Sequence, residues 1–205
     1  ITTDHIRTLL SQGESDPLPN APAGAGVGES FTAEHVAALP TEAIAELSAG
    51  FDIHVLGRIS DDAFSGFTAD QIEAFHSGIF QTITPEKMAN FDPAAMSGFS
   101  ANDIGMMGAG GIGANTHENP FSSLTAEQFG NLSLDAMGGF ETEDISSFSP
   151  EVWSAMDASQ FTAIPVEAVA GLTSEGFQNL PPEALSQITT DHIRTLLSQG
   201  ESDPL

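Results

Sequence analysis

Acidic side chains recur at eight-residue intervals in the second half of the sequence, a spacing that could gather carboxylates for cation binding. Hard cations such as Ca²⁺ take oxygen ligands, and stacked carboxylates repel one another until a cation neutralises them. The sequence contains neither a D-x-D-x-D-G loop nor a Gly-rich calcium nonapeptide. We therefore expect each acid to serve its own helix N-terminus, with no cofactor; weak, distributed Ca²⁺ binding is the alternative. The candidates for such binding are Glu127, Asp135, Glu143, Glu151, Glu167, Glu175 and Glu183.

Other residue types that could do chemistry are scattered. His117 and Glu118 could touch a metal from a loop, but a single histidine without a partner at ligand spacing is a weak signal. The GAGGIGA stretch at 108–114 has no strand signal before it and no basic residue beside it, which argues against a nucleotide loop. No G-x-S-x-G elbow or nucleophile–base pairing is present, so the sequence predicts that the protein is not an enzyme. We expect the histidines at the surface, namely His5, His35, His54, His76, His117 and His192.

Charge and composition exclude several partners. The 205 residues include 29 acidic and only 4 basic side chains, for a formal net charge of −25. Nucleic acids and anionic membrane surfaces require clustered Lys or Arg, so we expect neither as a partner. The absence of cysteine excludes disulfides and thiolate metal sites, and no run of apolar residues is long enough for a transmembrane segment. An apolar content of 40% with 14 Phe is sufficient for a packed core.

The elements that must position these side chains are eight-residue units, which we call octads. Nine octads run without a gap from Leu124 to Thr195, beginning LTAEQFGN and LSLDAMGG. Positions one and six are apolar in all nine, and position four is acidic in eight. Looser octads cover 31–46 and 59–106. This register favours core packing over ligand stacking for Trp153 and the phenylalanines. The predicted core residues are Leu124, Phe129, Leu132, Met137, Phe140, Ile145, Phe148, Trp153, Phe161, Ile164, Leu172, Phe177, Leu180 and Leu185.

Each octad has the features of a helix start. Thr, Ser or Asp at position two can act as N-cap, and Pro often follows at the first helical position. The acid at position four faces the positive end of the helix dipole, while positions one and six form a hydrophobic staple. A continuous helix would place positions one and six about 140° apart, and a strand would need alternation at period two. We therefore predict an all-α solenoid of short capped helices, one to two turns each, because helices this short require packing against neighbours.

A second, longer repeat frames the octads. Residues 188–205 repeat residues 1–18 without a mismatch, so the sequence has a period of 187 residues. We expect both ends to be cuts in a longer tandem chain. Residues 1–187 form one period, and 188–205 begin the next. Within the period, we predict an octad end at 1–12, a Gly/Pro-rich linker at 13–30, octads at 31–106, a Gly-rich loop at 107–123, and octads again at 124–187.

Units such as FTADQIEAF, ITPEKMANF and LTAEQFGNL resemble the "LTPEQIAAL"-type octapeptide runs of very large, repetitive bacterial surface or secreted proteins. The resemblance covers about three quarters of the chain. It implies a structural component of an extracellular or cell-surface fibre, stalk or filament that associates with further copies of itself, in series or laterally. The alternative is the repeat region of a surface adhesin. In that case the Gly-rich interruptions would bind a host, a glycan or a mineral, with Ca²⁺ assisting.

Overall fold

The protein is built of short helices. The computed structural model describes residues 32–49, 56–108 and 118–199, and within these ranges every regular element is an α-helix or a 3₁₀ helix (η) and no strand occurs. Most elements span four to six residues, which confirms the predicted all-α class. In chain order they are α2 (Ala33–Ala37), α3 (Thr41–Ala49), η2 (Leu56–Arg58), η3 (Asp61–Gly66), α4 (Ala69–Ala74), η4 (Ser77–Thr82), α5 (Pro85–Asn90), η5 (Pro93–Gly98), α6 (Ala101–Gly108), η6 (Pro120–Ser123), α7 (Ala126–Asn131), α8 (Leu134–Met137), α9 (Thr142–Ser147), α10 (Pro150–Ala155), α11 (Ala158–Ala163), η7 (Ala168–Gly171), α12 (Ser174–Asn179), α13 (Pro182–Leu185) and α14 (Thr190–Gln199).

Local hydrogen bonds explain why each octad starts and stops where it does. In α7, the Thr125 hydroxyl accepts the main-chain N–H of Gln128 at 3.1 Å, as expected for an N-cap at position two. The helix ends at Asn131. The next residue, Leu132, has an extended backbone that turns the chain, and its N–H donates to the carbonyl of Phe129. The same side-chain capping occurs at Thr32, Thr68, Thr84, Ser133, Ser149, Asp157 and Thr173. Proline occupies the first helical turn at Pro85, Pro93, Pro150 and Pro182, as the sequence predicts.

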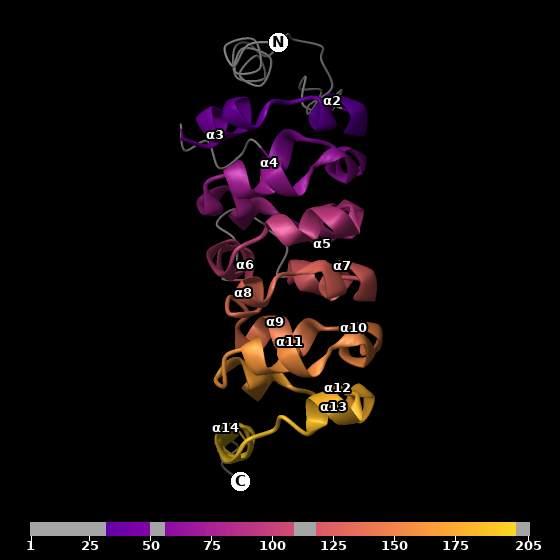
Figure 1. Ribbon diagram of the computed structural model, residues 1–205, viewed down its shortest axis with the longest axis vertical. Helices are drawn as coiled ribbons and strands as arrows, with labels where there is room; N and C mark the ends of the chain where they lie inside the picture. Colours follow the sequence, from indigo (N-terminus) through magenta and orange to yellow (C-terminus); the bar gives the residue numbers. More distant parts are fainter. Residues whose placement is uncertain (1–31, 50–55, 109–117, 200–205) are drawn as a thin grey trace, which may run out of the picture.

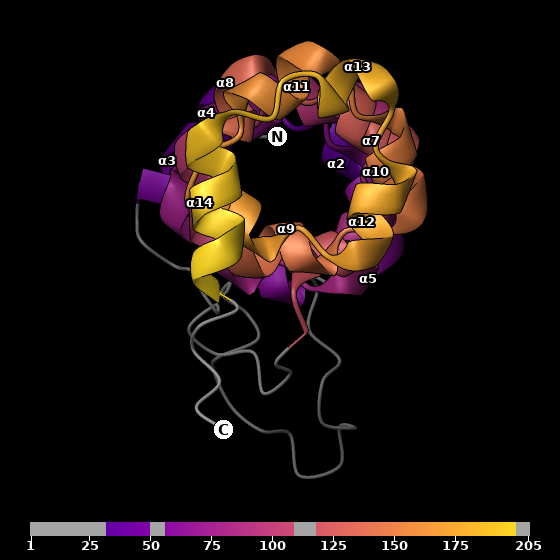
Figure 2. The same cartoon turned by 90° about the horizontal axis from the view of Figure 1, so that it is seen from below.

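The helices stack in three series. Each element contacts the element three places later in the chain. Series A contains α2, η3, α5, η6, α9, η7 and α14; series B contains α3, α4, η5, α7, α10 and α12; series C contains η2, η4, α6, α8, α11 and α13. We call three consecutive elements, one from each series, a tier. Figure 1 shows the tiers following one another along the long axis, and Figure 2 shows the elements of each tier arranged around that axis.

Three octads make one tier where the register is unbroken. Pro150 at the start of α10 lies 24 residues after Ala126 at the start of α7, the preceding helix of series B. The sequence shows octads clearly but not how many of them separate neighbours in space. That number depends on contacts between residues 24 or more positions apart, which no local pattern encodes.

The apolar side chains of positions one and six fill the space that the tiers enclose. Of the predicted core residues, Leu172 and Leu185 are partly buried and pack on the core. The prediction is wrong for Phe177, which is 49% exposed. Its helix, α12, is the last element of series B in the described part of the chain, so no following tier covers the ring. The core residues that are buried as predicted are Leu124, Phe129, Leu132, Met137, Phe140, Ile145, Phe148, Trp153, Phe161, Ile164 and Leu180.

The predicted Gly-rich loop at 107–123 is wrong at both of its ends. Met107 and Gly108 complete helix α6, and Pro120–Ser123 form η6. Phe121 is completely buried because η6 supplies the series A element of its tier and Phe121 takes the place of a sixth-position residue. Residues 109–117 of that segment, His117 included, lie outside the described residues, as do the predicted octad end at 1–12 and linker at 13–30.

Candidate functional site: the contact faces between tiers

The fifth position of the octad faces the preceding tier, a role that the sequence analysis missed. In the helices it is the third helical residue, and it is buried in nearly every described octad. Many of these residues are small or apolar, but seven are polar. The buried polar residues at this position are Gln71, Lys87, Asp103, Gln128, Asp144, Gln160 and His192.

Gln128 shows what a fifth-position amide does. Its Oε1 accepts the main-chain N–H of Thr125 at 3.0 Å, which completes a capping box at the start of α7. Its Nε2 donates to the carbonyls of Met88 and Phe91, at 2.9 and 2.8 Å, in the preceding tier. One side chain thus satisfies orphan groups on two tiers. Because an unpaired buried carbonyl is costly, the amide also fixes the register between them.

Two further glutamines make the same type of contact. Gln71 Nε2 donates to the carbonyls of Val36 and Leu39 at 2.9 and 2.8 Å. Gln160 Nε2 reaches the carbonyl of Phe129 at 3.3 Å. Val36 and Phe129 lie near the ends of α2 and α7 in the previous tier, and Leu39 lies in the bend after α2, so the contact is a repeated feature of the stack.

A lysine replaces the glutamine in α5. The Lys87 ammonium donates to the carbonyl of Ile59 at 2.8 Å and to a carboxylate oxygen of Asp61 at 2.7 Å, both in the preceding tier. It also lies 4.9 Å from the centroid of the Phe64 ring. The side chain is buried, whereas its partner Asp61 is about half exposed. Buried ammonium groups need such partners, and through them Lys87 joins the two tiers.

Asp144 is the buried carboxyl of α9. One carboxylate oxygen accepts the N–H of Glu141 at 2.8 Å, and the other accepts the amide N–H of Asn119 at 2.6 Å across the tier boundary. Burial raises the pKa of this carboxyl to about 6, even though both hydrogen bonds act to lower the pKa. The negative charges of Glu141 and Glu143 raise this pKa further. A raised pKa is typical of catalytic acids, but it also arises in structural sites.

Glycine at position eight lets tiers approach closely in four octads. A Cβ at Gly139 would overlap the main-chain carbonyl oxygen of Ala101 in the preceding tier. The same holds for Gly66 against Ala33, Gly98 against Ala69, and Gly171 against Thr142. All four octads carry alanine at position five, namely Ala63, Ala95, Ala136 and Ala168, and all four alanines are buried. Three other octads separate each Ala–Gly octad from the next. This longer spacing was not recognised from the sequence.

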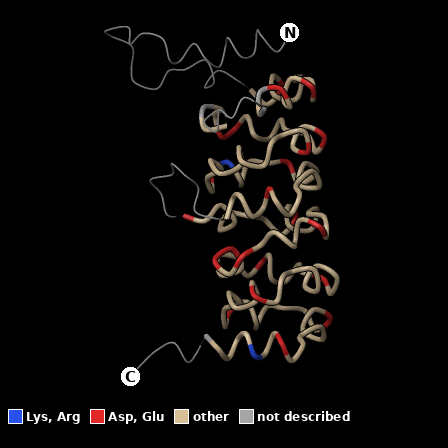
Figure 3. Tube along the Cα trace, turned by 90° about the vertical axis from the view of Figure 1, so that its left-hand side faces the viewer, with Lys and Arg blue, Asp and Glu red and all other residues tan. Residues whose placement is uncertain are grey.

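The predicted row of fourth-position carboxylates lies on the outside of the stack. All seven candidates are exposed, and consecutive ones belong to different series, so they face different sides of the tiers. Figure 3 shows acidic positions distributed over the length of the molecule. Among the described residues, no three acidic or histidine side chains converge in a group that could hold a metal ion. The candidates are Glu127, Asp135, Glu143, Glu151, Glu167, Glu175 and Glu183; weak, distributed cation binding to them remains a prediction.

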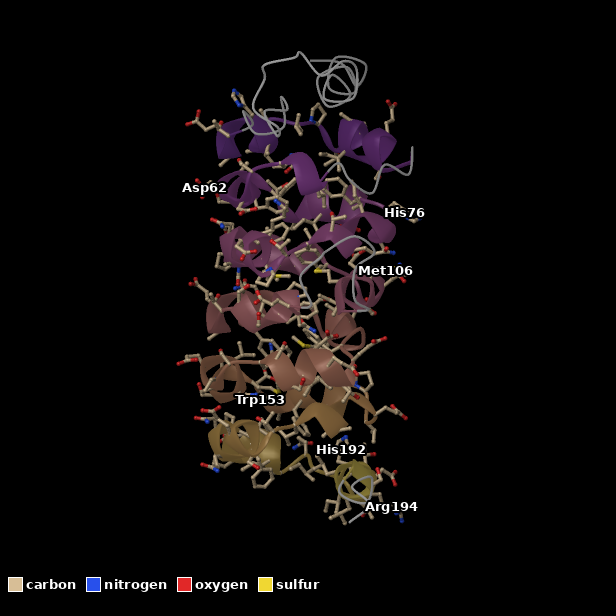
Figure 4. All side chains as sticks on the ribbon, turned by 180° about the vertical axis from the view of Figure 1, so that it is seen from behind. Asp62, His76, Met106, Trp153, His192 and Arg194 are labelled. Carbon is tan, nitrogen blue, oxygen red and sulfur yellow. The ribbon has the colours of Figure 1, made fainter. Side chains whose placement is uncertain are left out.

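The surface prediction for histidines is wrong for His192. Its side chain, labelled in Figure 4, is 5% exposed. Its Nδ1 accepts the N–H of Thr189 at 3.1 Å, and its ring packs edge-on against Phe161 at 5.5 Å. The reason is that His192 occupies the fifth position, which faces the preceding tier. His35 and His76 are exposed as predicted. The remaining three histidines lie outside the described residues, as do residues 13–30 and 109–117, which make up most of the Gly-rich interruptions on which the adhesin alternative depends.

Comparisons with known proteins add no assignment. No protein-family model, curated protein or solved structure matches the chain. No helix among the described residues combines the length and apolar character needed to cross a membrane. The function must therefore be argued from the stack itself and from its contact faces.

The last tier presents an uncovered contact face. Phe177 in α12 and Ile193 in α14 are each 49% exposed, and Leu197 is 69% exposed. A shallow depression lies between α12 and α14, and it is lined by Leu172, Thr173, Ser174, Phe177, Gln178 and Leu196. Sequence analysis could not separate this face from the core, because Phe177 and Ile193 occupy the same sixth position as residues that are buried elsewhere.

Proposed function

We propose that the chain is a unit of an α-helical solenoid whose 187-residue period repeats in tandem, and that the solenoid is the structural material of an extracellular or cell-surface fibre, stalk or filament. The observation that carries the proposal is the stacking of elements three places apart from α2 through α14. A stack in which each tier contacts only its neighbours can be lengthened without changing any existing contact.

The bonds between tiers support a structural role. Gln128 and Lys87 each join two tiers through buried hydrogen bonds, and the Ala–Gly octads bring main chains close together. Short helices of four to six residues are unstable in isolation, so rigidity in this design comes from stacking. Buried polar side chains such as Gln71, Lys87 and Gln128 bond to the preceding tier, which suits a structural part better than a catalyst.

The charge distribution favours association at the ends over association along the sides. Fourth-position acids line the outside of the tiers, and the net charge is −25. Like charges on neighbouring stacks repel at low ionic strength, which keeps stacks soluble and apart. The resemblance to repetitive bacterial surface proteins supports the extracellular location.

Electron microscopy of longer chains tests the proposal. Chains that contain one, two and four periods would be purified and imaged by negative stain. We expect rods of constant width whose length increases in proportion to the number of periods. Chains that collapse into compact particles, or beads joined by flexible connectors, would contradict the fibre. A matched control is the four-period chain with Gly139→Ala in every period, which should give shorter or irregular rods because the close approach to Ala101 is blocked.

A further inference from the structure

We infer that the uncovered face of the last tier, formed by Phe177, Ile193, Leu196 and Leu197, is the junction at which the next copy of the 187-residue unit stacks, so that the solenoid continues through the period boundary without a hinge. This inference deepens the proposed function, because it names the surface and the partner by which units join.

The first element of the next unit is already present in the structure. Residues 188–205 repeat residues 1–18, so α14 has the sequence with which the unit begins. This helix contacts η7, the previous element of series A, as every other series A element contacts its predecessor. His192 of α14 is buried against Phe161 of the preceding unit. The first helix of one unit therefore packs against the end of the unit before it, with the same three-element spacing as in the rest of the stack.

The exposed residues of the last tier are those that interior tiers cover. Phe177 is the sixth-position residue of α12, and its counterparts in series B, Phe129 and Trp153, are 0% and 2% exposed. Trp153 is covered by the following tier, where Gly176 lies directly against its indole ring. Ile193 likewise has a buried counterpart in series A, Val169 at 2% exposed. One more tier would therefore bury these apolar residues, as the interior tiers bury their counterparts.

The depression beside Phe177 crosses the boundary between units. Five of its lining residues belong to the first unit, and Leu196 belongs to the repeated segment. Helix α14 ends at Gln199, three residues after Leu196 of this depression. The outer surface offers no comparable group: Leu134, the other large exposed apolar residue in the described part, stands alone on α8 at 54% exposed.

Single cysteines give a direct test, because the chain contains none of its own. Phe177→Cys and the control Leu134→Cys would be placed in the present chain and in a two-unit chain, in which residues 1–205 are followed by a further copy of residues 19–205. The rate of reaction with an aromatic disulfide reagent would be measured at low protein concentration. Circular dichroism would establish that each variant retains its helix content.

In the present chain both cysteines should react at similar, fast rates. In the two-unit chain, the cysteine at 177 of the first unit should react at least about tenfold more slowly, since a covered thiol reacts only after local opening. The cysteine at 134 should be unaffected, and a cysteine at 177 of the second unit should remain fast. Equal reactivity of the cysteine at 177 in both units would overturn the junction.

The result is separable from the fate of the fibre proposal. Protection of the cysteine at 177 without rods in the electron microscope would leave the junction standing and reject the fibre. Rods with a fully reactive cysteine at 177 would support the fibre and reject this junction.

Discussion

The side-chain amide of Gln128 donates to the main-chain carbonyl of Phe91 at 2.8 Å, although the two residues are 37 positions apart. The same amide also completes the capping box of its own helix. A residue that appears to be an ordinary helix-start glutamine is thus a connection between tiers. Its removal should affect stability far more than its local role suggests.

Gln128→Leu should lower the free energy of unfolding by about 1–3 kcal/mol, because the carbonyl of Phe91 would be left buried without a donor and the carbonyl of Met88 would keep only the N–H of Phe91. Urea denaturation followed by far-ultraviolet circular dichroism would measure the change. The matched control is Asn131→Ala in the same helix, which removes an exposed bond to the carbonyl of Glu127. That variant should change stability by less than about 0.5 kcal/mol. Equal effects of the two variants would show that the inter-tier bond is unimportant.

Glycine-to-alanine substitutions should have opposite signs at two nearby positions. Gly139→Ala should destabilise by about 1–3 kcal/mol, because the new methyl group would overlap the carbonyl oxygen of Ala101 and force the tiers apart. Gly130→Ala, in helix α7, meets nothing within 4 Å and should stabilise by about 0.4–1 kcal/mol through the unfolded chain. Thermal melting of both variants against the parent chain checks the prediction. A stable Gly139→Ala protein would mean that the tiers are not in close contact there.

Salt should stabilise the protein without a specific requirement for calcium. The exposed acids and the net charge of −25 repel one another, and raising NaCl from about 0.01 to 0.15 M shortens the screening length from about 30 to 8 Å. The melting temperature should rise by about 2–4 °C for each kcal/mol of repulsion removed. CaCl₂ at the same ionic strength should give a similar rise. A further increase of several degrees with Ca²⁺, reversed by a chelator, would instead indicate cation sites among the fourth-position acids.

The local part of this fold could be predicted from sequence because the octad contains its own helix signals. Each helix signal acts within its own octad. Examples are the N-cap Thr125 of α7 and Pro150 in the first turn of α10, each with the apolar first and sixth positions of the same octad. Short helices, their boundaries and most of the core follow from these features. The exposed Phe177 was mispredicted because its environment depends on whether another tier follows, which its octad does not encode.

The connections between tiers could not be predicted in the same way, because they join residues far apart in the chain. Lys87 bonds to Ile59, and Asn119 to Asp144, across intervals that the octad register does not mark. A signal was nevertheless present at position five. In the nine regular octads this position holds Gln, Ala, Asp, Val, Gln, Ala, Gly, Ala and His, with no Glu, Ser or Thr. Such a restricted set of residue types is typical of a buried position, and it would have predicted that His192 is buried.

The buried carboxyl of Asp144 should make stability depend on pH. Its folded-state pKa is raised to about 6 from 3.8, chiefly by burial. Folding therefore favours the protonated form, so the contribution of Asp144 to stability is fully present below about pH 4 and is lost as the pH rises through about 6. At pH 7 the difference amounts to at most about 3 kcal/mol, because each pKa unit corresponds to about 1.4 kcal/mol.

Asp144→Asn should remove this contribution, because an amide does not ionise. The substituted amide can still accept the N–H of Asn119, but it has only one oxygen, so the bond from the N–H of Glu141 is lost. The informative quantity is consequently the slope of unfolding free energy between about pH 4 and pH 7, and not its absolute value at one pH. The slope should become less negative in Asp144→Asn and should be retained in the exposed control Glu127→Gln. Urea titrations at several pH values measure it, and parallel profiles for the parent and Asp144→Asn would mean that Asp144 ionises as freely in the folded chain as in the unfolded one.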